Sequence, residues 1–301
     1  SEVALITANT RDYLYLFAKD GRCRRVSVHE IPQNGDEKHL AELTDFSRRD
    51  TITAALALPR SGSSDGYLFM VTEQGMVKRV TLADFLAASA SPELSVMNVD
   101  EKDKLASVLV TQGGQEVILV SSEGQSIRFS EEDVRSMGLA AGGVGGMKLK
   151  KGVTVIYAAV VDPDGELLTI TAQGYAKRSA LSEYSRQGRN GGGIVTHKTT
   201  PRTGDVTAAL LIPAAPPEAI IVLPRKGGPK SAALDEIPTM GRSVQGKQIV
   251  EIGDGNSVIA LRSVTSSYQV AVENRVVVEE EIEPVTTGPV KKANPFADKA
   301  T

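Results

Sequence analysis

The sequence has little from which to build a disulfide, a metal centre or an aromatic cleft. Its 301 residues include one cysteine, Cys23, and three histidines that lie far apart, His29, His39 and His197. A lone cysteine cannot form an internal disulfide, which favours a reducing compartment, and no pair of these residues has the spacing of metal ligands. Tryptophan is absent and aromatic residues make up only 4% of the chain, which argues against a sugar-binding cleft or a base-stacking platform. We therefore expect no metal and no cofactor.

Long apolar stretches and a strong net charge are also missing. The longest apolar runs, such as residues 52–58 and 206–212, cover about seven residues, whereas a membrane-spanning helix needs about 20. Lys and Arg number 34 against 37 Asp and Glu, a net charge of -3, so a uniformly basic nucleic-acid binder is excluded and any basic surface is local. No leader peptide precedes the first strand pattern, and the opening at Ser1 suggests a fragment. These features predict a cytoplasmic protein with no membrane contact.

What the sequence does contain is a fivefold internal repeat. In each copy a run of four mostly apolar residues is followed, after a short gap, by a glycine and then by basic residues. The glycines are separated by 54, 49, 50 and 53 residues, which is the spacing of propeller blades. The five anchor glycines are Gly21, Gly75, Gly124, Gly174 and Gly227.

Each copy predicts several strands. A β-rich run precedes the four-residue run, and turn-forming residues such as 61–66 and 162–165 separate the two, which predicts a hairpin between neighbours in sequence. A third strand follows the anchor glycine, as at 76–82 and 175–181, and Gly143, Gly193 and Gly246 recur nineteen residues after three of the anchors. Short helical turns are expected at 83–88 and 131–137. The predicted fold is all-β, a propeller-like disc of four-stranded antiparallel blades with five repeats and an incomplete sixth.

These repeats predict one folded domain, residues 1–278, and a tail. The expected blades cover approximately residues 1–50, 51–103, 104–153, 154–204 and 205–256, with a partial blade at 257–278, where 268–278 could pair with the strand 258–264. Residues 279–301 begin with an acidic run and continue in Thr, Pro, Lys and Ala, so we expect a disordered tail.

Basic residues recur on the third strand and define the candidate site. In a radial array, equivalent residues form an arc, which suits the phosphates of a bent polyanion; the alternative is a solvated strand edge that prevents aggregation. A glycine-rich run at 186–193 adds backbone amides that could approach a phosphate, although a flexible connector would have the same composition. Equivalent runs flank it in the neighbouring repeats. The DNA-binding candidates are Arg24, Arg25, Lys78, Arg79, Arg128, Lys177, Arg178, Arg186, Arg189, Lys230, Arg242 and Lys247.

No arrangement of residues indicates catalysis. The sequence shows no nucleophile elbow between a strand and a helix, and His197 has no evident nucleophile or carboxylate partner. The acidic cluster at 131–133 is typical of the start of a helical turn. We therefore predict no catalytic residue in this chain.

Several blade sequences resemble a known family. Residues 8–12 (ANTRD), 123–124 with 127–129 and 134–138, and above all 173–178 (QGYAKR) with 181–184 (LSEY) are similar to the C-terminal domain of the bacterial DNA gyrase A protein. The related domain of the topoisomerase IV A protein, which acts in substrate selection, is the second choice. A protein-interaction propeller without a role in nucleic-acid binding stays open as a different class of function.

The resemblance implies a β-pinwheel, in which adjacent blades exchange strands, and a DNA-wrapping role at a basic perimeter in support of supercoiling. It implies an accessory domain of an ATP-dependent type IIA topoisomerase, associated with the bacterial nucleoid. Its partners would be duplex DNA, the ATPase B subunit of gyrase or topoisomerase IV, and the rest of the A subunit. The gyrase box Q-R-R-G-G-K-G is not seen in the first repeat. Residues 187–193 match four of its seven positions and are interpreted as a degenerate blade loop.

Overall fold

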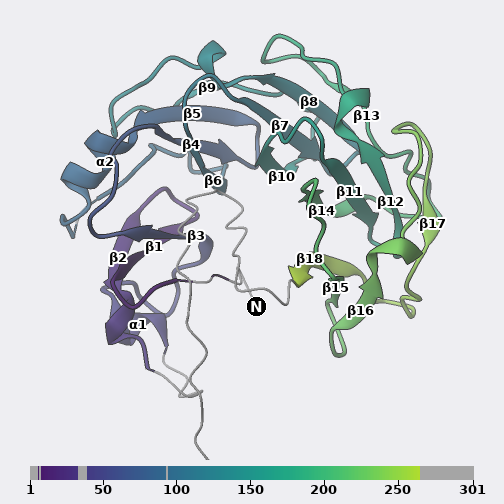
Figure 1. Ribbon diagram of the computed structural model, residues 1–301, viewed down its shortest axis with the longest axis horizontal. Helices are drawn as coiled ribbons and strands as arrows, with labels where there is room; N and C mark the ends of the chain where they lie inside the picture. The colour runs from purple at the N-terminus through teal and green to yellow at the C-terminus, as the bar shows by residue number, and fades with distance from the viewer. Residues whose placement is uncertain (1–5, 7, 33–38, 93, 265–301) are drawn as a thin grey trace, which may run out of the picture.

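Five antiparallel sheets follow one another around an arc (Figure 1). The computed structural model describes residues 6, 8–32, 39–92 and 94–264. The all-β, propeller-like architecture predicted from the repeats is confirmed. In order of the sheets along the chain, the strands are β1 (Asp12–Ala18), β2 (Cys23–Ser27) and β3 (Ile52–Pro59); β4 (Tyr67–Thr72), β5 (Met76–Thr81), β6 (Leu105–Thr111) and β9 (Val144–Gly145); β7 (Glu116–Ser121), β8 (Gln125–Ser130), β10 (Val155–Val160) and β13 (Ile194–Val195); β11 (Glu166–Thr171), β12 (Tyr175–Ala180), β14 (Val206–Ile212) and β17 (Lys247–Gln248); and β15 (Ala219–Pro224), β16 (Lys230–Ala233) and β18 (Val258–Val264).

Helical structure in the described residues is short, as expected. The turns predicted at 83–88 and 131–137 are present as α2 (Leu82–Ala88) and as a single 3-10 turn at Glu131–Asp133. The Thr81 hydroxyl accepts a hydrogen bond from the backbone N–H of Asp84 and so caps α2. The other short helices are α1 (Leu40–Leu43) and the 3-10 turns Val28–Glu30, Leu181–Glu183 and Leu234–Glu236.

Strands are exchanged between neighbouring repeats, and this corrects the predicted hairpins. The opening strand of the second repeat, β3, pairs with β1 of the first repeat and not with β4, which follows it in sequence. In the same way β6 pairs with β4 and β10 with β7. The turn-forming residues between these strands therefore connect two sheets. The exchange implied by the family resemblance is confirmed.

The same exchange explains the end of the described chain. β18, which the sequence assigned to an incomplete sixth blade, pairs with β15 and completes the fifth sheet. The described residues thus form five blades, three with four strands and two with three. The expected strand at 268–278 and the tail at 279–301 lie outside the described residues.

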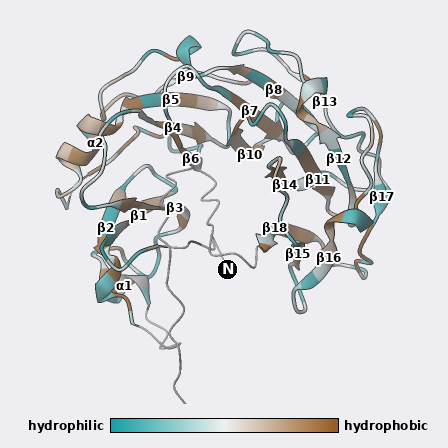
Figure 2. Cartoon of the chain, in the orientation of Figure 1, coloured by the Kyte–Doolittle hydropathy of each residue, from teal (hydrophilic) through white to brown (hydrophobic). Residues whose placement is uncertain are grey.

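The hydrophobic core lies in layers between adjacent blades. Both faces of the central strands are buried, because β4 directs Leu68 and Met70 into one cluster and Phe69 and Val71 into the next. Figure 2 shows the resulting hydrophobic strands within the blades and the hydrophilic connections around them. Each blade is therefore stabilised mainly by its neighbours, as in other repeat architectures.

The repeated glycines lie where a short outer strand packs closely against a third strand. Gly193 lies just before β13 at a φ of +76°, and a Cβ there would collide with the backbone carbonyl of Ser126 on β8. Gly124 ends the turn that leads into β8, at a φ of +81°, and its Cβ would collide with the carbonyl of His197. Only glycine allows both this backbone conformation and this close contact. The two glycine series are thus the two sides of one inter-repeat junction.

Across the described ranges, no helix is long and apolar enough to cross a bilayer.

Candidate nucleic-acid interface

The third-strand arginines are held by cross-strand carboxylates and by the next repeat. On β8, Arg128 forms an ion pair with Glu116 at 2.5 Å, and its Nη1 donates to the carbonyls of Leu181 and Tyr184 at 2.9 and 3.1 Å. On β12, Arg178 pairs with Glu166 at 2.6 Å, and its Nε donates to a carbonyl of the following repeat. Because each guanidinium is engaged on two sides, its first role is to join adjacent blades.

In the first two blades a tyrosine ring takes the place of the glutamate. The guanidinium carbons of Arg25 and Arg79 each lie 4.3 Å from a ring centroid, that of Tyr13 and that of Tyr67 respectively. Arg79 also lies 3.5 Å from the fully buried carboxylate of Glu131. Stacking of this kind stabilises the sheet and leaves little of either guanidinium for a ligand.

The lysines of the third strands are buried, contrary to the prediction of an exposed arc. Lys78 and Lys177 are both 0% exposed. The Lys78 ammonium donates to the carbonyls of Val96 and Leu139 at 2.7 and 2.6 Å, and Lys177 donates to Ser179 at 2.6 Å. Burial lowers the pKa of each lysine to about 8. Neither ammonium can reach a phosphate from this position, so these two residues are corrected from rim contacts to internal supports.

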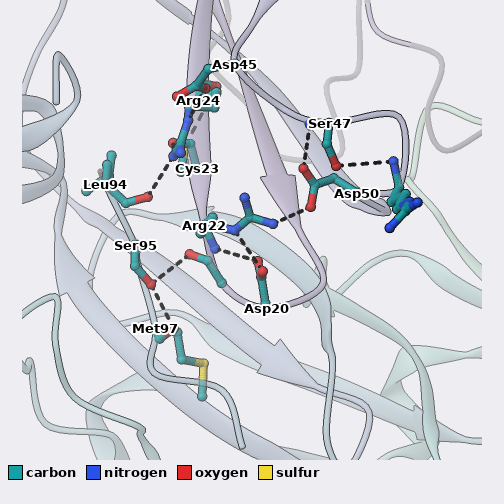
Figure 3. A network of polar contacts seen from close by, with 12 residues as sticks. Asp20, Arg22, Cys23, Arg24, Asp45, Ser47, Asp50, Leu94, Ser95 and Met97 are labelled. Carbon is teal, nitrogen blue, oxygen red and sulfur yellow. Dashed lines mark hydrogen bonds and ion pairs between the residues drawn. The ribbon is translucent and has the colours of Figure 1, made fainter. Parts of the chain in front are cut away.

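Arg24 belongs to a polar network around the first blade (Figure 3). Its side chain forms an ion pair with Asp45 and donates to the carbonyls of Cys23 and Leu94 at 2.8 and 3.4 Å. The neighbouring Arg22 pairs with Asp20 at 2.8 Å and with Asp50. This network fastens the first blade to the segment that follows it and to the second repeat.

The glycine-rich run is folded against the preceding blade rather than being a loose connector. Arg189 is half-buried and donates from Nη1 to the carbonyl of Gly145 at 2.9 Å, and Arg242 donates equivalently to the carbonyl of Val195 at 2.9 Å. Within the run, the backbone N–H of Asn190 donates to Gly146. These two arginines therefore join the loops to the outer strands β9 and β13.

Three predicted residues remain accessible. Arg186 is 57% exposed and forms two long ion pairs, with Glu116 and with Asp133, each at 3.9 Å. Lys230 and Lys247 are exposed as well, although the Lys230 ammonium donates to the carbonyl of Glu251 at 2.6 Å. Only these cations of the predicted set present most of their charge to solvent.

The predicted set of DNA-binding residues leaves out two exposed lysines at the outer edge. Lys148 and Lys198 follow β9 and β13, which lie on the outside of the arc in Figure 1. Neither side chain has an ion-pair or hydrogen-bond partner within the described part of the chain. Each stands 24 residues after an anchor glycine, so a search of the later parts of the repeats would have found them. Arg135 is a third exposed cation of this kind.

Two observations on the described residues concern chemistry other than surface charge. No cluster of three or more His, Cys, Asp or Glu side chains that could hold a metal ion occurs among them. His197 is buried between the Thr169 hydroxyl and the Gln245 carbonyl, each at 2.8 Å, and burial lowers its pKa to about 4. Exposed cations at the outer surface can attract an anionic ligand.

Comparison with known families gives one match that extends over most of the described chain. The model of the DNA gyrase C-terminal domain, a β-propeller, matches residues 12–35, 66–112, 115–162, 165–213 and 230–265. The DNA gyrase A protein of Escherichia coli is 31% identical over 264 residues, and that of Haloquadratum walsbyi is 30% identical over 266; each alignment covers 86% of this chain. The chain spans only 30% and 31%, respectively, of the length of these relatives.

Solved structures show the same fold. A DNA gyrase A C-terminal domain superposes with a TM-score of 0.73 at 24% identity, covering 85% of this chain and 83% of that one. The C-terminal domain of DNA topoisomerase IV superposes with a TM-score of 0.76 at 25% identity, covering 87% and 82%.

Proposed function

Because this chain belongs to the DNA gyrase C-terminal domain family, we propose that it binds and bends duplex DNA as an accessory domain of a type IIA topoisomerase. The binding uses phosphates and not base sequence. The observation that carries this proposal is a set of six exposed cations on the third strands, the outer strands and the segments that follow them, of which all but Arg186 have no carboxylate partner in the described structure. They are Arg135, Lys148, Arg186, Lys198, Lys230 and Lys247.

A curved row of cations favours bent DNA for an electrostatic reason. Each phosphate that a lysine or arginine neutralises releases condensed counterions, and successive contacts around a curve offset the cost of bending the duplex. The chain's net charge of -3 limits non-specific adsorption elsewhere on the surface. With aromatic residues at only 4%, stacking on unpaired bases contributes little.

The buried and paired cations of the predicted set support this surface indirectly. Arg79, Arg128 and Arg178 hold each third strand against the next repeat, and Lys78 does so from inside. Lys177 acts through Ser179 on its own strand, whose hydroxyl donates to the Met240 carbonyl of the next repeat. We assign them to the spacing between blades, which sets the curvature of the row. Loss of one of these contacts would change the curvature of the DNA-binding surface rather than the charge of that surface.

In the complete enzyme this domain would act together with the rest of the A subunit and with the ATPase B subunit. The enzyme would work in the bacterial cytoplasm, on the nucleoid. It would supply no catalytic residue. A role as the corresponding domain of topoisomerase IV is the second candidate, supported by the structural similarity to that domain. The gyrase role and the topoisomerase IV role are separated by ligating a nicked plasmid with the domain bound. A domain that wraps DNA in one sense changes the linking number of the closed circle.

Binding itself is tested by fluorescence anisotropy with a labelled duplex, from about 50 to 200 mM salt. We expect the logarithm of the association constant to fall linearly with the logarithm of the salt concentration, by about 0.9 per phosphate contact. Arg186→Gln should lower that slope. A duplex that does not bind at the lowest salt concentration would overturn the proposal and favour a protein-interaction propeller.

A further inference from the structure

One position of the repeat follows the same backbone contact in four copies but differs in charge. The residues at this position are Asn98, Lys148, Lys198 and Glu251, and all four are exposed. In each case the carbonyl of the preceding residue packs against an anchor glycine of the blade before it. The carbonyl and glycine pairs are Met97 with Gly21, Met147 with Gly75, His197 with Gly124 and Val250 with Gly174.

A second contact fixes three of these positions from the other side. The backbone N–H groups of Asn98, Lys148 and Lys198 donate to carbonyls of the following repeat, at 3.2, 2.9 and 3.1 Å. The accepting residues are Ala141, Gly191 and Val244. Each side chain is therefore anchored at a junction of two repeats, on a backbone that cannot swing away.

From this register we propose that Lys148 and Lys198 form successive phosphate contacts on neighbouring blades, and that this row of contacts ends where Asn98 and Glu251 replace them. The inference rests on the proposed function and names the contacts that carry it. Lys148 follows β9, the outer strand of the second blade, and Lys198 follows β13, the outer strand of the third blade. At this position of the repeat those two blades hold the bound duplex, and the fourth blade adds no contact there.

Charge explains the ends of this row of contacts. A phosphate that meets Lys148 or Lys198 gains a cation with no competing carboxylate in the described structure, whereas the neighbouring Lys150 is already paired with Glu123 at 2.5 Å. Asn98 offers a neutral side chain. Glu251 places a carboxylate at the equivalent point, where it repels the phosphates of the DNA backbone. The main-chain carbonyl of Glu251 accepts a hydrogen bond from the Lys230 ammonium.

The test compares salt slopes of duplex binding in four variants, Lys148→Gln, Lys198→Gln, Glu251→Lys and the control Lys150→Gln. The first two should each lower the slope by about 0.9, one phosphate contact, and Glu251→Lys should raise it by up to about the same amount. Lys150→Gln removes an equal charge from a lysine that is already paired, and should change the slope by less than half as much. All four positions are exposed, so circular dichroism should show an unchanged fold.

The outcomes separate this inference from the proposed function. If the unmodified domain does not bind DNA, the proposed function fails and the inference fails with it. If the domain binds but Lys148→Gln and Lys198→Gln behave like Lys150→Gln, the row of lysine contacts is wrong while DNA binding stands. A Glu251→Lys variant with an unchanged slope would overturn the proposed end of the row.

Discussion

Alanine at Gly124 tests the inter-repeat junction on which the fold depends, because Gly227 provides a matched control. Both glycines follow a second strand, with φ of +81° and +91°. A side chain at Gly124 would collide with the carbonyl of His197, whereas a Cβ at Gly227 meets no heavy atom within 4 Å. The left-handed backbone costs an alanine about 1–2 kcal/mol at either site, and overpacking at Gly124 adds about 1–3 kcal/mol.

We therefore expect Gly124→Ala to lower the free energy of unfolding by about 1–3 kcal/mol more than Gly227→Ala does. Urea denaturation followed by far-UV circular dichroism measures both values, and for a chain of this size each kcal/mol moves Tm by about 2–4 °C. Equal losses in the two variants would refute the reasoning, because they would show that the close approach adds nothing to the backbone strain. A change in the slope of the urea transition would indicate local unfolding of one blade instead.

Two further predictions concern side chains of the candidate interface. The pKa of His197 is lowered to about 4, whereas the ordinary value for histidine is about 6.5, so the unfolded state binds more protons between these two pH values. The domain should therefore lose stability as the pH falls through that window, by up to about 1.4 kcal/mol per pH unit. Urea titrations at each pH should show that His197→Gln loses less stability over the same window. Arg128→Met should cost about 1–3 kcal/mol of stability, because it leaves Glu116 and two carbonyls without their donor, yet it should leave the salt slope of DNA binding unchanged; a lower slope with unchanged stability would show that Arg128 contacts phosphate.

The repeat and the fold class are readable from the sequence because they depend on local rules. Gly124 and its equivalents need a left-handed backbone, and a run such as 117–120 is apolar on both faces because blades cover it on both sides. Strand pairing is different, because β3 carries the same apolar pattern whether it pairs with β4 or with β1. Turn-forming residues between β3 and β4 are compatible with either connection, so local sequence favoured the hairpin that the fold does not use.

The candidate site was predicted only in part, because charge does not reveal burial. Lys177 stands beside Arg178 in a basic pair, which in sequence favours exposure, yet its side chain is 0% exposed. Arg128 and Arg178 gain their glutamate partners across the strand pair, a register that only the β7–β8 and β11–β12 pairings define. Lys148 and Lys198 lie in less regular segments, where a period of 24 residues from the anchor glycine was the available signal.

The central claim, that the outer cations bend DNA, is tested most directly by the distance between the ends of a bound duplex. Donor and acceptor dyes at the two ends of a long linear duplex report that distance by energy transfer, over the same salt series as the binding measurement. We predict that transfer rises as the domain binds and falls back as salt releases it. Binding with unchanged transfer would contradict the account, because the cations would then hold the duplex without bending it.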